Sequence, residues 1–357
     1  MPDTNQDEAL KEFRSTRLIW PILIGVAILG YTIYQLRQDG INPFTDIDWN
    51  LHVFGWIALG FVCMAIRDIG YIWRMRLLTD EKLNWRSAIE VTLLWEFASA
   101  LSPSIVGGSA VAIFMLMREK ISAGRSTAIV FITIFLDELF YIAILPIVLL
   151  IVDHHQIFGP VNGVEAGTRF GTGLIVGFWI AYFVLMSYTS FLAFALFFNP
   201  AGTNRVLRKV VHWKIFSRWQ ESGEKMADEL MIASREFRSK SFGYWTKAWI
   251  STCLAWLGRY LVLNCVLAAF NPNLSFHEHV VAFARQAVMF VVMIVSPTPG
   301  SSGIAEGVFG QLFAEFSPDG VVLILANVWR LITYYPYLFI GIIVFPIWLR
   351  RVMRRKK

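Results

Sequence analysis

The sequence predicts an all-α fold, a polytopic membrane helix bundle with about six full spans and two re-entrant helical hairpins in an inverted repeat. The chain has 357 residues, of which 56% are hydrophobic and only 16% are charged, whereas soluble domains have roughly 25% charged residues. The charges are clustered, and several of the apolar stretches between them reach the ~20 residues that a membrane-spanning helix needs. A soluble core would not give six separate runs of this length.

The six predicted full spans follow one another along the whole chain. They cover residues 18–36, 51–73, 126–152, 171–198, 248–270 and 321–349. A polar segment, 1–17, precedes the first span and ends with Lys11, Arg14 and Arg17. The first apolar run is long enough to span and has no small-residue cleavage pattern after it, so we expect a retained anchor and no cleavable signal peptide.

Two further apolar stretches, 87–117 and 280–316, are interrupted in the middle by prolines and glycines. The interrupting residues are Pro103, Gly107 and Gly108 in the first stretch and Pro297, Pro299, Gly300 and Gly303 in the second. Proline cannot continue a helix, and glycine tolerates the turn that follows. Each limb is ~20–25 Å long at 1.5 Å per residue, which is short for a ~30 Å hydrocarbon core. We therefore expect two hairpins that return to the side they entered from; two pairs of tilted complete spans are the alternative.

The distribution of basic residues fixes the predicted orientation. With both termini in the cytoplasm, the cytoplasmic segments hold 26 of the 32 lysines and arginines, and the outer segments hold only Arg37 and Arg169. This asymmetry follows the positive-inside rule. The net charge of +6 is therefore a topology signal, and no basic soluble domain suggests nucleic-acid binding. We expect a multi-pass protein of the cytoplasmic (inner) membrane; the sequence does not indicate its oligomeric state.

The intramembrane charges recur at matching spacings in two units, 51–152 and 248–349. Arg67 lies 36 residues before Pro103 and Asp137 lies 34 after it, while Arg259 lies 38 before Pro297 and Arg330 lies 33 after it. The two hairpins open from opposite sides, so the units form an inverted repeat, an architecture typical of secondary transporters. A cytoplasmic connector, 199–247, joins the units, and a basic tail, 350–357, ends the chain. The interleaved basic and apolar residues of the connector suit an amphipathic surface helix, either a lipid-entry platform or a simple connector.

Charged residues within the apolar stretches are the strongest functional signal. They are Arg67, Asp68, Glu90, Glu96, Asp137, Glu138, Arg259, Arg285, Glu306 and Arg330. Four arginines facing lipid would cost ~10–14 kcal/mol, so they must face a polar cavity or one another. Either they form ion pairs that fix helix packing, or together they line a binding path.

The hairpin breaks suggest what such a path would bind. A half-helix that starts inside the membrane presents unpaired N–H groups and a positive dipole end, which suit a phosphate or carboxylate. Arginine adds donors in a geometry that matches phosphate. The glycines at the breaks would let a ligand approach the backbone, or would only permit tight turns and helix crossings. We expect an anionic, phosphate-bearing substrate at Arg67, Arg259, Arg285 and Arg330, balanced by Glu96, Asp137 and Glu306.

Signals for enzymatic or metal chemistry are weak. The run 300–303 is neither a nucleophile elbow nor a phosphate-binding loop, and the pairs His154/His155 and His277/His279 lack zinc-ligand spacing. The cysteines, Cys63, Cys253 and Cys265, all lie in apolar segments and form no metal or disulfide pattern. We expect no catalytic residue, no metal and no cofactor.

The run from Ser296 to Glu306 resembles a motif of the lysylphosphatidylglycerol synthase transmembrane (flippase-like) family, which usually reads Pro-x-Pro-Gly-Gly-x-Gly-x-x-Glu. Pro103, Gly107 and Gly108, followed by Arg118 and a span with Asp137, resemble that family's other element. The resemblance covers roughly 18–349; Ser301 departs from it, because a second glycine is usual there.

The resemblance implies two re-entrant hairpins in inverted symmetry and translocation of a lipid, typically an anionic-headgroup phospholipid or a polyprenyl carrier. Some members add a soluble aminoacyltransferase domain; with eight residues after the last predicted span, we expect a standalone member that does not aminoacylate lipid. We expect a lipid translocase. A non-transporting scaffold or partner subunit and an intramembrane lipid-headgroup enzyme are the alternatives.

Overall fold

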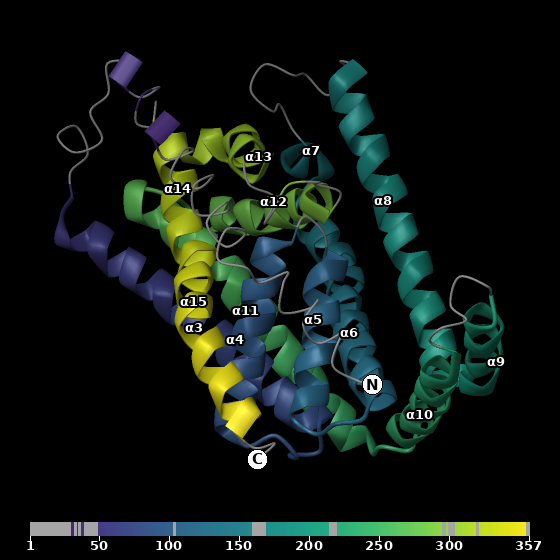
Figure 1. Cartoon of the computed structure of the whole chain (residues 1–357). Coiled ribbons are helices and arrows are strands. Elements are labelled where there is room, and N and C mark those ends of the chain that lie inside the picture. Colours follow the sequence, from purple (N-terminus) through teal and green to yellow (C-terminus); the bar gives the residue numbers. More distant parts are fainter. Residues whose placement is uncertain are drawn as a thin grey trace.

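A computed structural model describes residues 30, 31, 34, 37, 38, 49–102, 105–158, 169–213, 220–294, 298, 304–318 and 321–354. Within these ranges the fold is helical throughout (Figure 1). The helices are α3 (Leu51–Leu78), α4 (Trp85–Leu101), α5 (Ile105–Arg118), α6 (Ala123–Ile151), α7 (His154–Ile157), α8 (Arg169–Ala193), α9 (Pro200–Val211), α10 (Gln220–Arg238), α11 (Phe242–Phe270), α12 (Phe276–Ile294), α13 (Ile304–Phe313), α14 (Val322–Thr333) and α15 (Tyr335–Arg354). A π-helical turn, Phe194–Phe198, extends α8, and a 3-10 turn, Ala314–Phe316, follows α13.

Five helical stretches in the described ranges are long and apolar enough to cross a membrane. They are Leu51–Leu78, Ala123–Ile151, Ile175–Phe198, Phe242–Phe270 and Val322–Val352. Each coincides with one of the predicted full spans, so the protein is an all-helical, multi-pass membrane protein. Most of the predicted first span, 18–36, lies outside the described residues.

Local sequence signals set several helix starts. The side chains of Asn50, Asn84 and Ser241 accept hydrogen bonds from backbone N–H groups three residues on, at 3.1, 2.8 and 3.3 Å respectively. Such N-caps satisfy donors that would otherwise have no partner at the start of a helix. The first of them begins α3, which runs for 28 residues and ends at Leu78, five residues beyond the predicted span end at 73.

The last predicted span, 321–349, consists of two helices with a break at Tyr334. The backbone of Tyr334 leaves the helical region, with φ −127° and ψ −58°. Pro336 follows two residues later; it has no N–H to donate, and its ring crowds the carbonyl four residues back. The local sequence therefore encodes the break. Arg330 precedes it and Tyr337 follows it, and both side chains are buried in the bundle interior.

Both apolar stretches with predicted interruptions are divided into two helices. The first forms α4 and α5, and the second forms α12 and α13. The chain between α4 and α5 passes through 102–104, and that between α12 and α13 through 295–303, as the prolines predict. Pro103, Pro297, Pro299, Gly300 and Gly303 lie outside the described residues.

Helices α3 and α11 form the closely packed antiparallel pair at the centre of the bundle. A Cβ atom added at Gly70 would lie 2.8 Å from the Ser251 carbonyl oxygen, and one at Gly258 would lie 2.8 Å from the Cys63 carbonyl oxygen. Small residues allow the two backbones to come this close. Close packing of this kind is a main source of the energy that holds helix pairs together in membranes. The two predicted repeat units meet along this pair, since α3 belongs to the first unit and α11 to the second.

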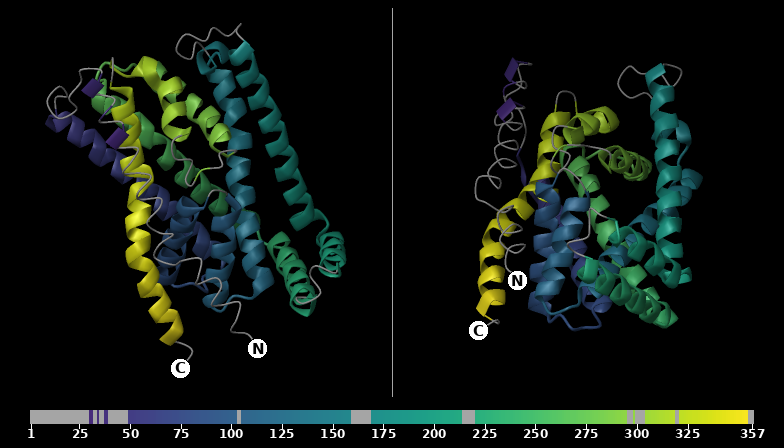
Figure 2. Two further views of the ribbon diagram at one scale, coloured as in Figure 1. Left: turned by 45° about the horizontal axis from the view of Figure 1, so that its top comes forward. Right: turned by 45° about the vertical axis from the view of Figure 1, so that its right-hand side comes forward.

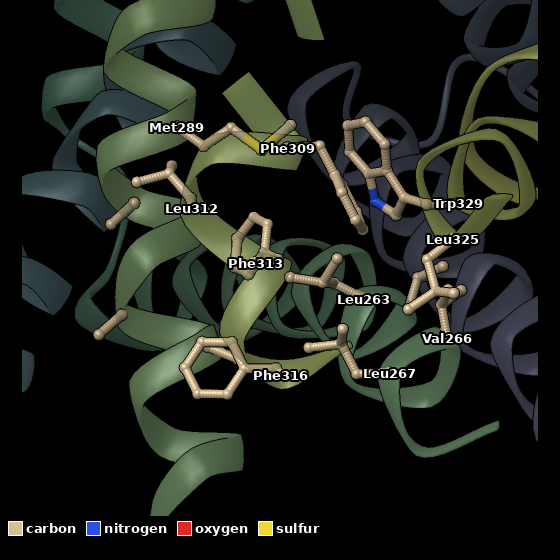
Figure 3. Packing of buried hydrophobic residues seen from close by; sticks show 14 of the residues in the cluster. Leu263, Val266, Leu267, Met289, Phe309, Leu312, Phe313, Phe316, Leu325 and Trp329 are labelled. Carbon is tan, nitrogen blue, oxygen red and sulfur yellow. The ribbon is translucent and has the colours of Figure 1, made fainter. Parts of the chain in front are cut away.

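Two large apolar clusters lie on either side of the centre. One joins α11 to α12, α13 and α14 through side chains that include Leu263, Met289, Phe309, Phe313 and Trp329 (Figure 3). The other joins α4, α5, α6 and α15 through residues such as Leu94, Met115, Ile129 and Trp348. Between them lies the polar region described below.

The connector helices α9 and α10 lie at the same end of the molecule as the last turns of α15, which we call the connector end, while α12 and α13 lie at the opposite end (Figures 1 and 2). Arg125 at the start of α6 bonds Glu236 of α10 at 2.6 Å, and Glu229 accepts from the Gly124 amide at 3.0 Å. Lys240 bonds Asp80 of the α3–α4 turn at 2.8 Å. Helix α10 is therefore fixed to the bundle by ion pairs.

Candidate functional site

A cavity of about 310 Å³ lies between the two predicted repeat units. Its walls come from α3, α4, α5 and α6 on one side and from α11, α12, α14 and α15 on the other. Ser102 and Ser109 bring it to the first helix break, and Met293 and Thr298 bring it to the second. Residues from both breaks therefore reach one polar space.

Arg67 lies behind the cavity wall, between two carboxylates. Its side chain is 1% exposed; it bonds Asp68 at 2.8 Å and forms an ion pair with Glu96, which itself lines the cavity. The Tyr337 hydroxyl donates to Asp68 at 2.7 Å, and the guanidinium lies over the Tyr71 ring at 4.7 Å. These contacts hold Glu96 at the wall and leave Arg67 little freedom to bind a ligand.

Arg74 and Asp137 form the second ionic group and both line the cavity. Two guanidinium nitrogens of Arg74 donate to the two carboxylate oxygens of Asp137 at 2.6 and 3.0 Å. Arg74 also donates to the Thr252 hydroxyl at 2.8 Å, and the Trp256 indole donates to Asp137 at 2.8 Å. A bidentate pair of this kind is strong and fixes orientation, so it ties α3 and α6 to α11.

Arg330 and Glu306 form the third group, in the second unit. Arg330 Nε donates to Glu306 Oε1 at 2.8 Å, and both side chains are buried. Arg330 reaches the cavity, whereas Glu306 lies behind it. The pair joins α13 to α14, next to the second break.

Arg259 is the predicted site arginine that differs from the others. It lines the cavity from α11, and it makes no hydrogen bond or ion pair in the part of the chain that the structure describes. Its guanidinium lies 5.5 Å from the centre of the Trp256 ring, and its charge acts on Glu96. A guanidinium in this state retains all five of its donors for a ligand.

Two threonine hydroxyls in the cavity wall also have no hydrogen-bond partner. Thr92 of α4 is 4% exposed and Thr133 of α6 is 6% exposed, and their hydroxyl oxygens make no hydrogen bond to any residue that the structure describes. Buried polar groups are rarely left unpaired, and an exception calls for a bound water or ligand. The two hydroxyls and Arg259 therefore offer donors to the same space.

Arg285 is separated from the other predicted site arginines. It forms an ion pair with Glu315 at 2.7 Å and donates to the backbone oxygens of Gln156 and Leu312. This cluster lies by the α7–α12 contact, with a second hollow lined by His155 and His277. Arg285 holds helix ends together there and does not line the central cavity.

The glycines of the first break serve helix packing. Gly108 lies in the first turn of α5 against α4, where an added Cβ atom would lie 3.0 Å from Ser99 Cα. Gly107 precedes it in the same turn. The contact at Gly108 fits a close helix crossing, and Ser109, the next residue of α5, lines the cavity.

The structure adds residues that the sequence pattern did not single out. Arg74 lies just past the predicted span end at 73 and so counts among the cytoplasmic residues in the sequence, whereas in the structure α3 continues through it to Leu78. Thr92 and Thr133 are uncharged, so they do not stand out in a search for charged residues within apolar stretches. No cluster of three or more metal-ligating side chains occurs in the described ranges.

The long apolar helices and the buried ionic groups define a multi-pass membrane protein with an internal polar cavity. The profile of the family described as "Lysylphosphatidylglycerol synthase TM region" matches residues 18–341, and the chain belongs to this family. It is 26% identical over 335 residues to a "UPF0104 membrane protein" of Archaeoglobus fulgidus, an alignment that covers 90% of this chain and 94% of that protein. No solved structure matches the chain.

Proposed function

We propose that the protein is a translocase for a phosphate-bearing membrane lipid, with the headgroup site in the central cavity. The observation that carries this proposal is Arg259, a guanidinium without an ionic partner in the described structure that faces a polar space within the membrane bundle. Placing such a charge there is costly, and a lipid phosphate would compensate it with bidentate bonds.

The immediate surroundings of Arg259 suit a headgroup. The hydroxyls of Thr92 and Thr133 supply further donors, and the first turn of α5 begins beside Ser109 with N–H groups that have no partner within the helix. Aromatic side chains, among them Trp95 and Phe290, form the rest of the wall. Such a mixture of apolar walls and a few polar donors is usual for small-molecule sites.

We infer an inverted repeat in which α3, α4, α5 and α6 correspond to α11, α12, α13 and the α14–α15 pair. Two pairs of helix contacts support this correspondence. Helix α6 packs on α11 as α14 packs on α3, and α4 packs on α15 as α12 packs on α6. The antiparallel α3–α11 pair lies at the centre of this scheme, with its two close approaches at Gly70 and Gly258.

We infer further that α4–α5 and α12–α13 are re-entrant hairpins. Their members have 17, 14, 19 and 10 residues, and at 1.5 Å per residue none reaches ~30 Å. The first hairpin starts and ends at the connector end, and the second lies at the opposite end (Figure 2). The lipid headgroup would cross between the two hairpins while its tails remain in the bilayer.

The other functions considered have less support. A scaffold predicts that the buried charges are all paired and that no cavity remains, which does not fit Arg259 and the 310 Å³ space. An intramembrane enzyme needs a nucleophile next to a base. Of the carboxylates in the cavity, Asp137 is held by Arg74 and Trp256 and Glu96 by Arg67, which does not favour either of them as a base.

Reconstitution in lipid vesicles tests the translocase. Vesicles that contain the protein should move a labelled phosphatidylglycerol or phosphatidic acid between leaflets faster than protein-free vesicles. Arg259→Gln should remove most of this activity, whereas Arg205→Gln, an exposed arginine of α9, should retain it. If neither lipid nor a polyprenyl phosphate moves or binds, the translocase proposal is wrong.

A further inference from the structure

Glu138 differs from the other carboxylates of the cavity in having no cationic partner. Glu96 is paired with Arg67, and Asp137 with Arg74. Glu138 lines the same cavity, and its only hydrogen bond among the described residues comes from the Thr189 hydroxyl of α8, which donates to Oε2 at 2.9 Å. Its Oε1 has no partner there.

The charges around Glu138 disfavour a second negative group. Asp137 is adjacent on its own helix, and the titratable group that faces it from α8 is the Tyr188 hydroxyl. Arg259 from α11 and Arg74 from α3 reach the same cavity, as does Glu96 from α4. Arg74 bonds Asp137, and Arg67 pairs with Glu96. No arginine forms an ion pair with Glu138 among the described residues, and Arg259, which also lines the cavity, makes no bond to it.

We propose that Glu138 is the proton-binding group of the cavity, and that a phosphodiester headgroup binds there together with a proton. This inference rests on the proposed lipid function. A carboxylate with one hydroxyl donor and no cation is poorly compensated at membrane depth, so its neutral form is favoured. A proton from water would bind to Oε1, while Oε2 continues to accept from Thr189.

Binding of a proton to Glu138 and binding of an anion to the cavity are thermodynamically coupled, so each strengthens the other. A headgroup phosphate at Arg259 would share the cavity with Glu138, and repulsion between two anions in a poorly solvated space is large. Protonation of Glu138 removes that repulsion, so a phosphodiester binds more tightly at low pH, and its binding takes up a proton. The coupling is reciprocal.

The test measures binding of a short-chain phosphatidylglycerol to the full-length protein in detergent at pH 5.5 and 8. This lipid has a phosphodiester whose charge does not change in that range and carries no amine. Wild type should bind about fivefold or more tightly at pH 5.5. Glu138→Gln, which mimics the protonated side chain, should bind with the same high affinity at both pH values. Glu81→Gln, whose side chain is 76% exposed, should keep the wild-type pH dependence.

Equal wild-type binding at both pH values, or unchanged pH dependence in Glu138→Gln, would overturn the proposal. So would a Glu138→Gln protein that loses phosphatidylethanolamine but not phosphatidylglycerol at both pH values, because the carboxylate would then bind an ammonium group. Infrared difference spectroscopy gives a readout independent of lipid. A protonated-carboxyl band present in wild type and missing from Glu138→Gln supports the proton site even if no lipid is translocated, and its absence from wild type overturns it.

Discussion

The buried arginines differ in how completely the protein compensates them. Arg67, Arg74 and Arg330 each form an ion pair with a carboxylate, whereas Arg259 forms no ion pair among the described residues and lies over the Trp256 ring. An arginine that completes an ion pair contributes mainly to the fold, and one without a partner is available to a ligand. Removing a paired arginine should therefore mainly destabilise the fold, whereas removing Arg259 should mainly weaken ligand binding.

Arg259→Gln should weaken lipid binding while leaving the fold nearly intact. Loss of a charge-assisted contact costs about 1.5–3 kcal/mol, or about tenfold or more in affinity, while the free energy of unfolding should change by roughly 1 kcal/mol or less. Arg74→Gln is the matched comparison, because it leaves the Asp137 carboxylate buried without its cation at a cost of about 3–5 kcal/mol. Thermal unfolding in detergent and lipid binding, measured side by side, would contradict the assignment if Arg259→Gln is the less stable variant.

At the scale of the helices, the fold depends on a close crossing at its centre and on ionic contacts at its connector end. The α3–α11 crossing brings backbone against backbone at Gly70 and Gly258. The Asp80, Arg125, Glu236 and Lys240 side chains join the α3–α4 turn to α6, α10 and the start of α11. Each feature predicts a separate response to mutation.

Gly258→Ala should destabilise the protein although alanine is the better helix former. The added Cβ atom would lie 2.8 Å from the Cys63 carbonyl oxygen and 3.0 Å from the Arg67 amide nitrogen, backbone atoms that cannot rotate away, and overpacking of this kind costs about 1–3 kcal/mol. Gly55→Ala is the control, since nothing lies within 4 Å of its Cβ position. It should be neutral or stabilising. A thermal midpoint of Gly258→Ala equal to that of Gly55→Ala would show that the helices are further apart.

Asp80→Asn should lower stability near neutral pH and have no effect in acid. Partial burial opposes ionisation of Asp80, but the hydrogen bond and charge of Lys240 and the charge of Arg125 outweigh it and lower the pKa of the carboxyl. A lowered folded-state pKa gives stability that is present above the usual value of ~3.9 and is lost as the pH falls through the folded-state pKa. Thermal midpoints of both proteins from pH 7 down to 3 should converge at the acid end, and a constant difference would refute the ionic role.

At the scale of the whole molecule, the two ends differ in charge and in the hairpin that they present. The connector end holds α9, α10 and the ionic contacts of Asp80, while the opposite end holds α7, α12 and α13 (Figure 1). By the positive-inside rule, the excess of lysine and arginine at the connector end predicts that this end lies in the cytoplasm. In that orientation the two proposed hairpins would enter the membrane from opposite sides.

Cysteine labelling in intact cells measures that orientation. In a background with Cys63, Cys253 and Cys265 replaced by serine, a cysteine at Asn273 should react with a membrane-impermeant maleimide. Cysteines at Glu81 and Gly223 should react only after the membrane is opened. Labelling of position 223 in intact cells would reverse the proposed topology.

The sequence by itself determined the class of the protein, the five observed spans within the described residues and the positions of both helix breaks. Span length and hydropathy follow from bilayer thickness, and proline stops a helix through its own chemistry, so neither depends on distant residues. The family followed from the proline–glycine–glutamate motif and was confirmed. The break at Tyr334 depends on a local residue too, Pro336, but the hydropathy pattern concealed it.

Only the tertiary structure decided which buried charges pair with each other and which face the cavity. The pairs join residues as far apart in sequence as Arg74 and Asp137, 63 positions, and no periodicity encodes such a distance. For the same reason the sequence could not separate Arg259 from Arg285, which have equal charge and similar apolar surroundings along the chain. In the folded structure Arg285 lies against Glu315 and two carbonyl groups, whereas Arg259 faces the central cavity. The two arginines differ because ion pairing depends on which helices meet.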